Sequence, residues 1–195
     1  IIAYVYRKDK GILYTFSLKK YKIEIGGVNM PTVEDVLDDL TLQASEIVSR
    51  EDDSQIVIDL YNVISQKCEN GDLLNELNGI ERVFYLCQTF VLMMGSGGIE
   101  TYYKEPSGNY ANETVEALLE MNAKRTALIL DRGNGIFHEG IVPENQQLRM
   151  EELKNLDYSE ISWLFDLLDQ EFLQLKEDLE MLSLNYVLNH KEAFM

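Results

Sequence analysis

The stretch IERVFYLCQTFVLMMGSGG, residues 80–98, decides the fold. From Ile80 to Met94 it is apolar on nearly every side, and a helix that is apolar all round is buried in the protein interior. Gln88 and Thr89 interrupt the apolar run, which falls well short of the roughly 20 residues needed to span a bilayer. The stretch therefore predicts a helix at the centre of a bundle, ended by the glycine-rich turn at residues 95–98.

Amphipathic segments flank this central helix on both sides. Apolar residues recur in them at the spacing of one helix face, and Thr32 provides an N-cap for the first. We expect these flanking helices over residues 33–48, 54–69, 99–104, 110–130 and 159–190. Residues 133–147, rich in Gly and Pro, are expected to form a loop. The fold class is therefore mainly α, a helical bundle of five to six helices.

The first thirty residues follow a different pattern, because their apolar residues recur with a period of two. Strands are expected over residues 1–7 and 12–18, joined by a turn at residues 8–11, with a third strand over residues 21–25. Such a small N-terminal β-hairpin or meander is marginal alone. It must pack on the helical body, on a partner or on a second copy of the chain, which leaves a homodimer open.

Charge, periodicity and Gly/Pro content all change at residues 26–31, which is where we place the domain boundary. Residues 1–30 carry six Lys and Arg against Asp9 and Glu24, a balance of about +4. Residues 31–195 hold the other 11 bases and 32 acids, so they outweigh this leader and bring the chain to a net charge of −17. The sequence thus predicts a basic β-rich N-terminal element over residues 1–30 and an acidic α-helical domain over residues 31–195.

This acidity excludes some partners and favours others. A strongly negative surface repels phosphate groups, so we expect no direct nucleic-acid binding and no binding to an anionic membrane. The expected partner is a basic protein. Cys68 and Cys87 form neither a disulfide framework nor a metal motif, which indicates a cytoplasmic protein. The chain begins at Ile1 without an initiator Met, which is consistent with removal of an upstream segment, so the missing signal peptide carries little weight.

Catalytic chemistry has little support in the sequence. His138 and His190 are the only histidines, and no Glu-x-x-His pair is present. The glycines of residues 95–98 follow a helix rather than a strand and lack the lysine of a phosphate-binding loop. We therefore expect no enzyme, no catalytic residue, no cofactor and no metal site.

Carboxylates that lie off the apolar faces of the first and last helices are the candidate partner-binding residues. Carboxylates three or four residues apart on a helix lie roughly 5–6 Å from one another. This is similar in scale to the phosphates of a nucleic-acid strand, which follow one another at about 3.4 Å along the axis. The alternative is that the acidic face merely keeps the protein soluble. The candidates are Glu34, Asp35, Asp38, Asp39, Asp166, Asp169, Glu177 and Glu180.

The stretch GSGGIETYYKEPSGNYANETVEALLEMNA, residues 95–123, resembles the signature of a bacterial DNA-mimic protein family. That signature contains an Asn-Gly-Gly-Phe turn, an aromatic pair, a Ser-Gly-Asp-Tyr-like turn and a helix with Glu-Ala-Leu and a Gly-Ala pair. Its structural motif is matched by Gly97, Gly98, Tyr102, Tyr103, Ser107, Gly108 and Tyr110. Ser96, Ile99 and Asn122 depart from it.

The resemblance covers about residues 75–190. It implies an all-α domain without enzyme activity that binds the DNA-binding face of a transcription factor. The hypothesis is therefore a non-enzymatic protein-binding module, a DNA mimic whose acidic surface occupies the basic DNA-binding face of a regulator or other DNA-binding protein. Two alternatives stay open: an immunity-type inhibitor of a basic toxin, and a helical protein whose acidic surface is only solubilising.

Overall fold

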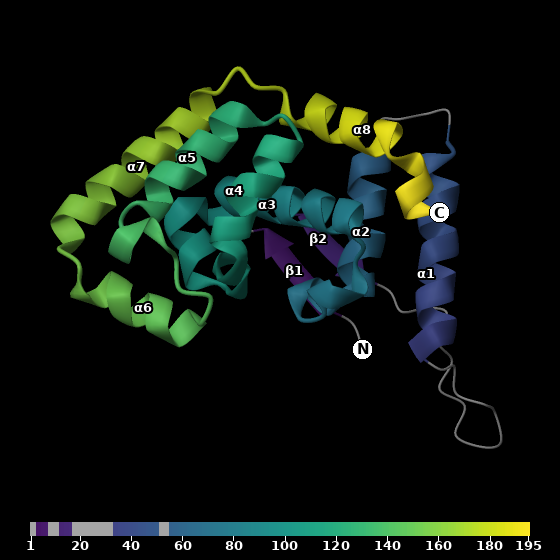
Figure 1. The fold of residues 1–195 in the computed structure, drawn as a ribbon, viewed down its shortest axis with the longest axis horizontal. Coiled ribbons are helices and arrows are strands. Elements are labelled where there is room, and N and C mark those ends of the chain that lie inside the picture. The colour runs from purple at the N-terminus through teal and green to yellow at the C-terminus, as the bar shows by residue number, and fades with distance from the viewer. Residues whose placement is uncertain (1–2, 8–11, 17–32, 51–54) are drawn as a thin grey trace. The chain divides into compact units, whose positions relative to one another are not determined.

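The computed structural model describes residues 3–7, 12–16, 33–50 and 55–195, with side chains from residue 36 onward. The chain forms two compact units, residues 1–36 and residues 37–195. The fold is mainly helical, as the sequence predicts (Figure 1). The described residues contain eight α-helices, more than the five to six expected. None of these helices is long and apolar enough to cross a membrane.

Two strands lie in the first unit. The strands β1 (Ala3–Arg7) and β2 (Ile12–Phe16) pair antiparallel, with Ala3 opposite Phe16 and Arg7 opposite Ile12. The turn expected at residues 8–11 and the third strand expected at residues 21–25 fall outside the described residues. The helix α1 (Val33–Val48) begins in the first unit and continues into the second.

The remaining helices belong to the second unit. They are α2 (Ile56–Lys67), α3 (Gly79–Lys104), α4 (Ala111–Glu120), α5 (Lys124–Asn134), α6 (Gln146–Asn155), α7 (Tyr158–Gln174) and α8 (Leu179–Asn189). Short 3-10 turns lie over residues 69–71, 74–76, 106–110, 138–140 and 191–194.

The helix α3 is central, as its apolar sequence predicts. It packs against α2, α4, α6, α7 and α8. Phe84 and Phe90 are fully buried, and the ring of Phe90 meets the rings of Tyr102 and Phe172 edge to face at 5.0 and 6.2 Å. Asn78 begins α3 with a capping box, since its side chain accepts from the helix start while Glu81 accepts from its backbone N–H.

The prediction of one long helix over residues 110–130 is wrong, because α4 ends before α5 begins. Asn122 takes a left-handed conformation with φ of 66°. The N–H of Ala123 donates to the carbonyl of Leu118 at 2.8 Å, and the N–H of Asn122 donates to Leu119 at 3.0 Å. This pair of bonds is a Schellman C-cap, in which asparagine takes the position that usually needs glycine.

The prediction of one helix over residues 159–190 is also wrong. The chain leaves helical geometry between Gln174 and Leu179, and Asp178 begins α8 by accepting from the N–H of Met181 at 2.9 Å. Neither Gly nor Pro marks this break, and the apolar spacing runs through it unchanged. The helix α6 begins at Gln146, inside the loop expected over residues 133–147, and has no counterpart among the predicted helices.

Candidate functional site

Asp169, a candidate partner-binding residue, caps a kink in α3. The predicted turn at residues 95–98 is narrower than expected, because α3 runs through Gly97 and breaks only at Gly98, where φ is +75°. The helix restarts at Ile99, whose N–H donates to Oδ1 of Asp169 at 2.8 Å. A Cβ built on Gly98 would lie only 2.0 Å from Oδ2 of Asp169. Glycine is therefore required here for both backbone geometry and space.

The environment of Asp169 raises the pKa of its carboxyl group. Burial raises the pKa of the Asp169 carboxyl, the N–H of Ile99 opposes the rise, and the nearby Asp166 and Glu100 carboxylates add to it. Asp166 and Asp169, both on α7, are therefore a pair of candidates that the structure brings together.

Glu177 caps α5 in the same way. Its carboxylate accepts from the N–H of Arg125 at 3.1 Å, and from the N–H and the hydroxyl of Thr126 at 2.9 and 2.7 Å. These donors lie at the start of α5, where backbone N–H groups have no partner within the helix. A negative charge at this end also interacts favourably with the helix dipole. Glu177 thus fixes the link between α7 and α8 to the start of α5.

The other candidates lie apart from one another. Asp38, Asp166 and Glu180 are exposed, and Asp39 accepts from the amide of Gln43 at 2.8 Å. Within the unit of residues 37–195, α1 and α7 lie at opposite ends (Figure 1), so Asp38 and Asp166 are not neighbours. The side chains of Glu34 and Asp35 fall outside the described part of the chain.

The aromatic motif residues build the interior. The hydroxyl of Tyr102 donates to Thr114 at 3.0 Å, and that of Tyr103 donates to the side-chain oxygen of Asn134 at 2.8 Å. The hydroxyl of Tyr110 donates to the carbonyl of Gly71 at 3.2 Å. Tyr102 and Tyr103 are buried, and each finds the hydrogen-bond partner that a buried hydroxyl needs. The motif therefore specifies the packing of α3 against α4 and α5.

The turn that follows the tyrosines holds a buried arginine, Arg149 of α6, which the sequence analysis missed. Its Nε donates to the carbonyl of Tyr103 at 2.6 Å, and Nη2 donates to the backbone carbonyl of Glu105 at 3.0 Å and to the side-chain oxygen of Asn109 at 2.9 Å. Burial lowers the pKa of this guanidinium. A Cβ on Gly108 would lie 2.7 Å from Nε, so the motif glycine leaves room for the arginine.

Ion pairing or burial involves six of the 11 cations of residues 37–195. The chain has 34 Asp and Glu, of which Asp9, Glu24, Glu34 and Asp35 precede residue 37, so residues 37–195 hold 30 acids against 11 bases. Five of these bases form ion pairs, and Arg149 is buried. The pairs are Arg50–Asp59, Lys67–Glu81, Arg82–Glu113, Lys104–Glu100 and Arg132–Glu171.

The acidity is not uniform over the surface. Arg125, Arg132 and Lys176 line one shallow cavity of about 500 Å³ between α5 and the end of α7, together with Glu171. This face carries more positive than negative side chains.

The described residues do not bring potential metal ligands together. They contain no group of three His, Cys, Asp or Glu side chains placed to hold a metal ion. Cys68 and Cys87 are free thiols that lie buried, and burial raises the pKa of each.

These features define an acidic, mainly helical protein in which Gly98, Tyr102, Tyr103 and Gly108 of the motif are buried and the carboxylates are divided between helix capping and the surface. The chain belongs to the DMP19-like protein family, whose model matches residues 75–190, more than half of the chain. This is a family of DNA-mimic proteins, so the resemblance seen in the sequence is confirmed. No curated protein and no solved structure is significantly similar to the chain.

Proposed function

We propose that this chain is a DNA mimic, whose acidic helical surface occupies the basic DNA-binding face of a regulator or other DNA-binding protein. Membership of a DNA-mimic family supports the proposal. The observation that carries it is the excess of acids in residues 37–195, which hold 30 acids against 11 bases, one of them the buried Arg149. Each of the five ion pairs neutralises one base and one acid, so the excess of negative charge is the same with or without them.

The proposed contact residues are the candidates with exposed carboxylates. Asp38, Asp166 and Glu180 stand on three different helices. Glu34 and Asp35 remain candidates on the strength of the sequence alone. Asp169 and Glu177 serve the surface indirectly, because by capping α3 and α5 they hold α7 and the start of α8 in place. Each of the three exposed carboxylates is held on a helix, so binding would order little additional backbone.

Such an interface has a clear physical signature. Complementary charges accelerate the encounter of the two proteins, and the binding weakens as salt screens them. An acidic surface that only keeps the protein soluble would bind no partner in this salt-dependent way. An inhibitor of a basic toxin would show the same salt dependence, but its partner would be a nuclease rather than a regulator.

The test is affinity capture from a lysate of the source organism at low salt, followed by elution with duplex DNA. We expect captured proteins to be released by DNA, since the chain and DNA compete for one basic face. The matched bait carries Asp38→Asn, Asp166→Asn and Glu180→Gln, and we expect it to retain less of the same proteins. Capture that neither DNA nor salt reverses would exclude the mimic, and a captured nuclease that the chain inhibits would favour the toxin inhibitor.

A further inference from the structure

Trp163, the only tryptophan of the chain, lies on the outward side of α7 with 67% of its surface exposed. Tryptophan is highly buried in most folded proteins, because its ring provides a large apolar area. The ring of Trp163 has no aromatic or cationic partner in the part of the chain that the structure describes. Exposed tryptophans of this kind are enriched among the side chains that dominate binding at protein interfaces.

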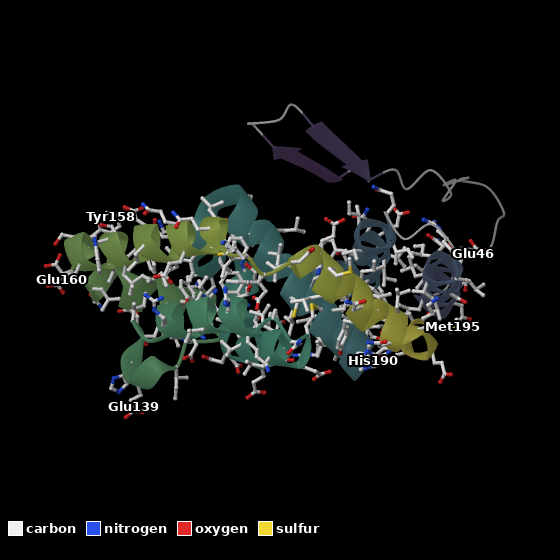
Figure 2. All side chains as sticks on the ribbon, turned by 90° about the horizontal axis from the view of Figure 1, so that it is seen from above. Glu46, Glu139, Tyr158, Glu160, His190 and Met195 are labelled. Atoms are coloured by element: carbon white, nitrogen blue, oxygen red, sulfur yellow. The ribbon has the colours of Figure 1, made fainter. Side chains whose placement is uncertain are left out.

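Two carboxylates flank this ring. Glu160 precedes Trp163 by three residues and Asp166 follows it by three, and both are exposed. Residues three apart on a helix are surface neighbours, with Cβ atoms about 5–6 Å apart. Figure 2 shows Glu160 pointing outward near the start of α7. Neither carboxylate forms an ion pair with a described residue.

An aromatic face between two carboxylates matches the chemistry of arginine. The guanidinium group is planar, stacks on aromatic rings and pairs with a carboxylate through two parallel hydrogen bonds. Lysine, a compact and strongly hydrated charge, fits such a site less well. A second copy of the chain is a poor occupant, because it would bring carboxylates against carboxylates at this face.

We infer that Glu160, Trp163 and Asp166 form an arginine-binding surface, on which an arginine of the partner stacks on the indole ring and pairs with a flanking carboxylate. The nature of the partner rests on the proposed function, because DNA-binding faces present arginines to phosphates and bases. The preference for arginine rests on the three side chains alone.

A fluorescence titration tests this preference directly. Because Trp163 is the only tryptophan, the tryptophan emission of the intact chain reports on this surface and no other. The probes are an arginine-rich peptide and a lysine-rich peptide of equal length and charge, added at low salt. We expect the arginine peptide to change the emission and to bind at least about threefold more tightly. Equal binding of the two peptides, or an emission that neither changes, would overturn the inference.

Variants separate this inference from the proposed function. With a partner that DNA displaces, we expect Trp163→Ala to weaken binding about tenfold and Trp163→Phe to weaken it less, since phenylalanine keeps an aromatic face. Leu173→Ala is the matched control, because Leu173 lies on the same helix and is 77% exposed. Unchanged circular dichroism and Tm establish that each variant folds.

The outcomes are distinguishable. If Trp163→Ala binds a DNA-displaceable partner as tightly as the unchanged chain, the arginine-binding surface is wrong and the proposed function stands. If no partner is displaced by DNA, the proposed function fails, and the peptide titration decides the inference by itself.

Discussion

The carboxylate of Asp169 on α7 accepts a hydrogen bond at 2.8 Å from the backbone N–H of Ile99, 70 residues earlier in the chain. Glu177 makes equivalent contacts with the start of α5. The acids of this protein therefore have two uses. Some cap the N-termini of neighbouring helices, and others stay in water, so the total charge of the chain overstates the charge available to a partner.

Gly98→Ala is expected to lower the free energy of unfolding by at least about 2 kcal/mol, because it combines a backbone conformation that essentially only glycine adopts, with φ of 75° and ψ of −175°, with a clash. The new Cβ would meet Asp169, whose Oδ2 lies 2.0 Å from its ideal position. Gly140→Ala is the control, since Gly140 has nearly the same φ, +74°, with nothing within 4 Å of the built Cβ. Urea unfolding of both variants measures the difference, and equal losses would mean that the contact with Asp169 contributes nothing.

Asp169→Ala is expected to lower the free energy of unfolding by about 0.5–2 kcal/mol, the range found for loss of an N-cap. Asp166→Ala, three residues away on the same helix, removes an exposed side chain and should change it by less than about 0.5 kcal/mol. Binding to the partner should respond in the opposite order, with the larger loss at Asp166. Equal effects of the two substitutions on stability would contradict the division of roles between them.

Stability should also depend on pH through Asp169. Burial raises the pKa of this carboxyl above its ordinary value of 3.8, so folding disfavours the ionised form. The contribution of Asp169 to the free energy of unfolding is therefore fully present below pH 3.8 and falls as the pH rises through the higher native pKa. The difference between the unchanged chain and Asp169→Asn, measured by urea unfolding across this range, should decrease with rising pH. A difference that increases would contradict the assignment.

Arg149→Ala is expected to cost about 3 kcal/mol or more, because hydrogen bonds to a charged group contribute about 1.5–3 kcal/mol each and a cavity remains. Arg149 is fully buried and donates to the backbone carbonyls of Tyr103 and Glu105 and to the side-chain oxygen of Asn109. Lys154→Ala is the control, since Lys154 is exposed on the same helix. The two Tm values provide the comparison, and a small loss at Arg149 would show that the turn after Tyr103 is held by other contacts.

Local patterns predicted the elements whose physics is local. The buried helix around Phe84 and Phe90 follows from a stretch that is apolar on nearly every side, and the helices α1 and α2 follow from amphipathic spacing. The breaks between α4 and α5 and between α7 and α8 were missed because the residues that form them also occur inside helices. Asn122 is a weaker signal than glycine for a left-handed C-cap, and Asp178 resembles any other acid of an acidic helix.

The candidate site was less predictable, because the role of a carboxylate depends on what faces it. Asp169 and Asp166 look equivalent in sequence, yet only Asp169 faces the open helix start at Ile99. The helix α6 was missed because the residue that it buries most completely is the charged Arg149. A pattern of apolar and polar residues predicts that a charged side chain lies on the surface. The exposure of Trp163 likewise depends on which side of α7 packs against the other helices, and the composition of the chain does not indicate it.

Salt dependence of partner binding should locate the interacting carboxylates. For a partner that duplex DNA displaces, we expect the Kd to rise steadily between low salt and physiological salt, because exposed charges are screened over about 8 Å at 0.15 M. Asp166→Asn should reduce the slope of log Kd against log salt, since one charge is lost from the interface. Glu177→Gln should leave the slope unchanged, because that carboxylate is held on the N–H groups of Arg125 and Thr126. A slope that responds to Glu177 and ignores Asp166 would place the interface at the start of α5 and away from the outward side of α7.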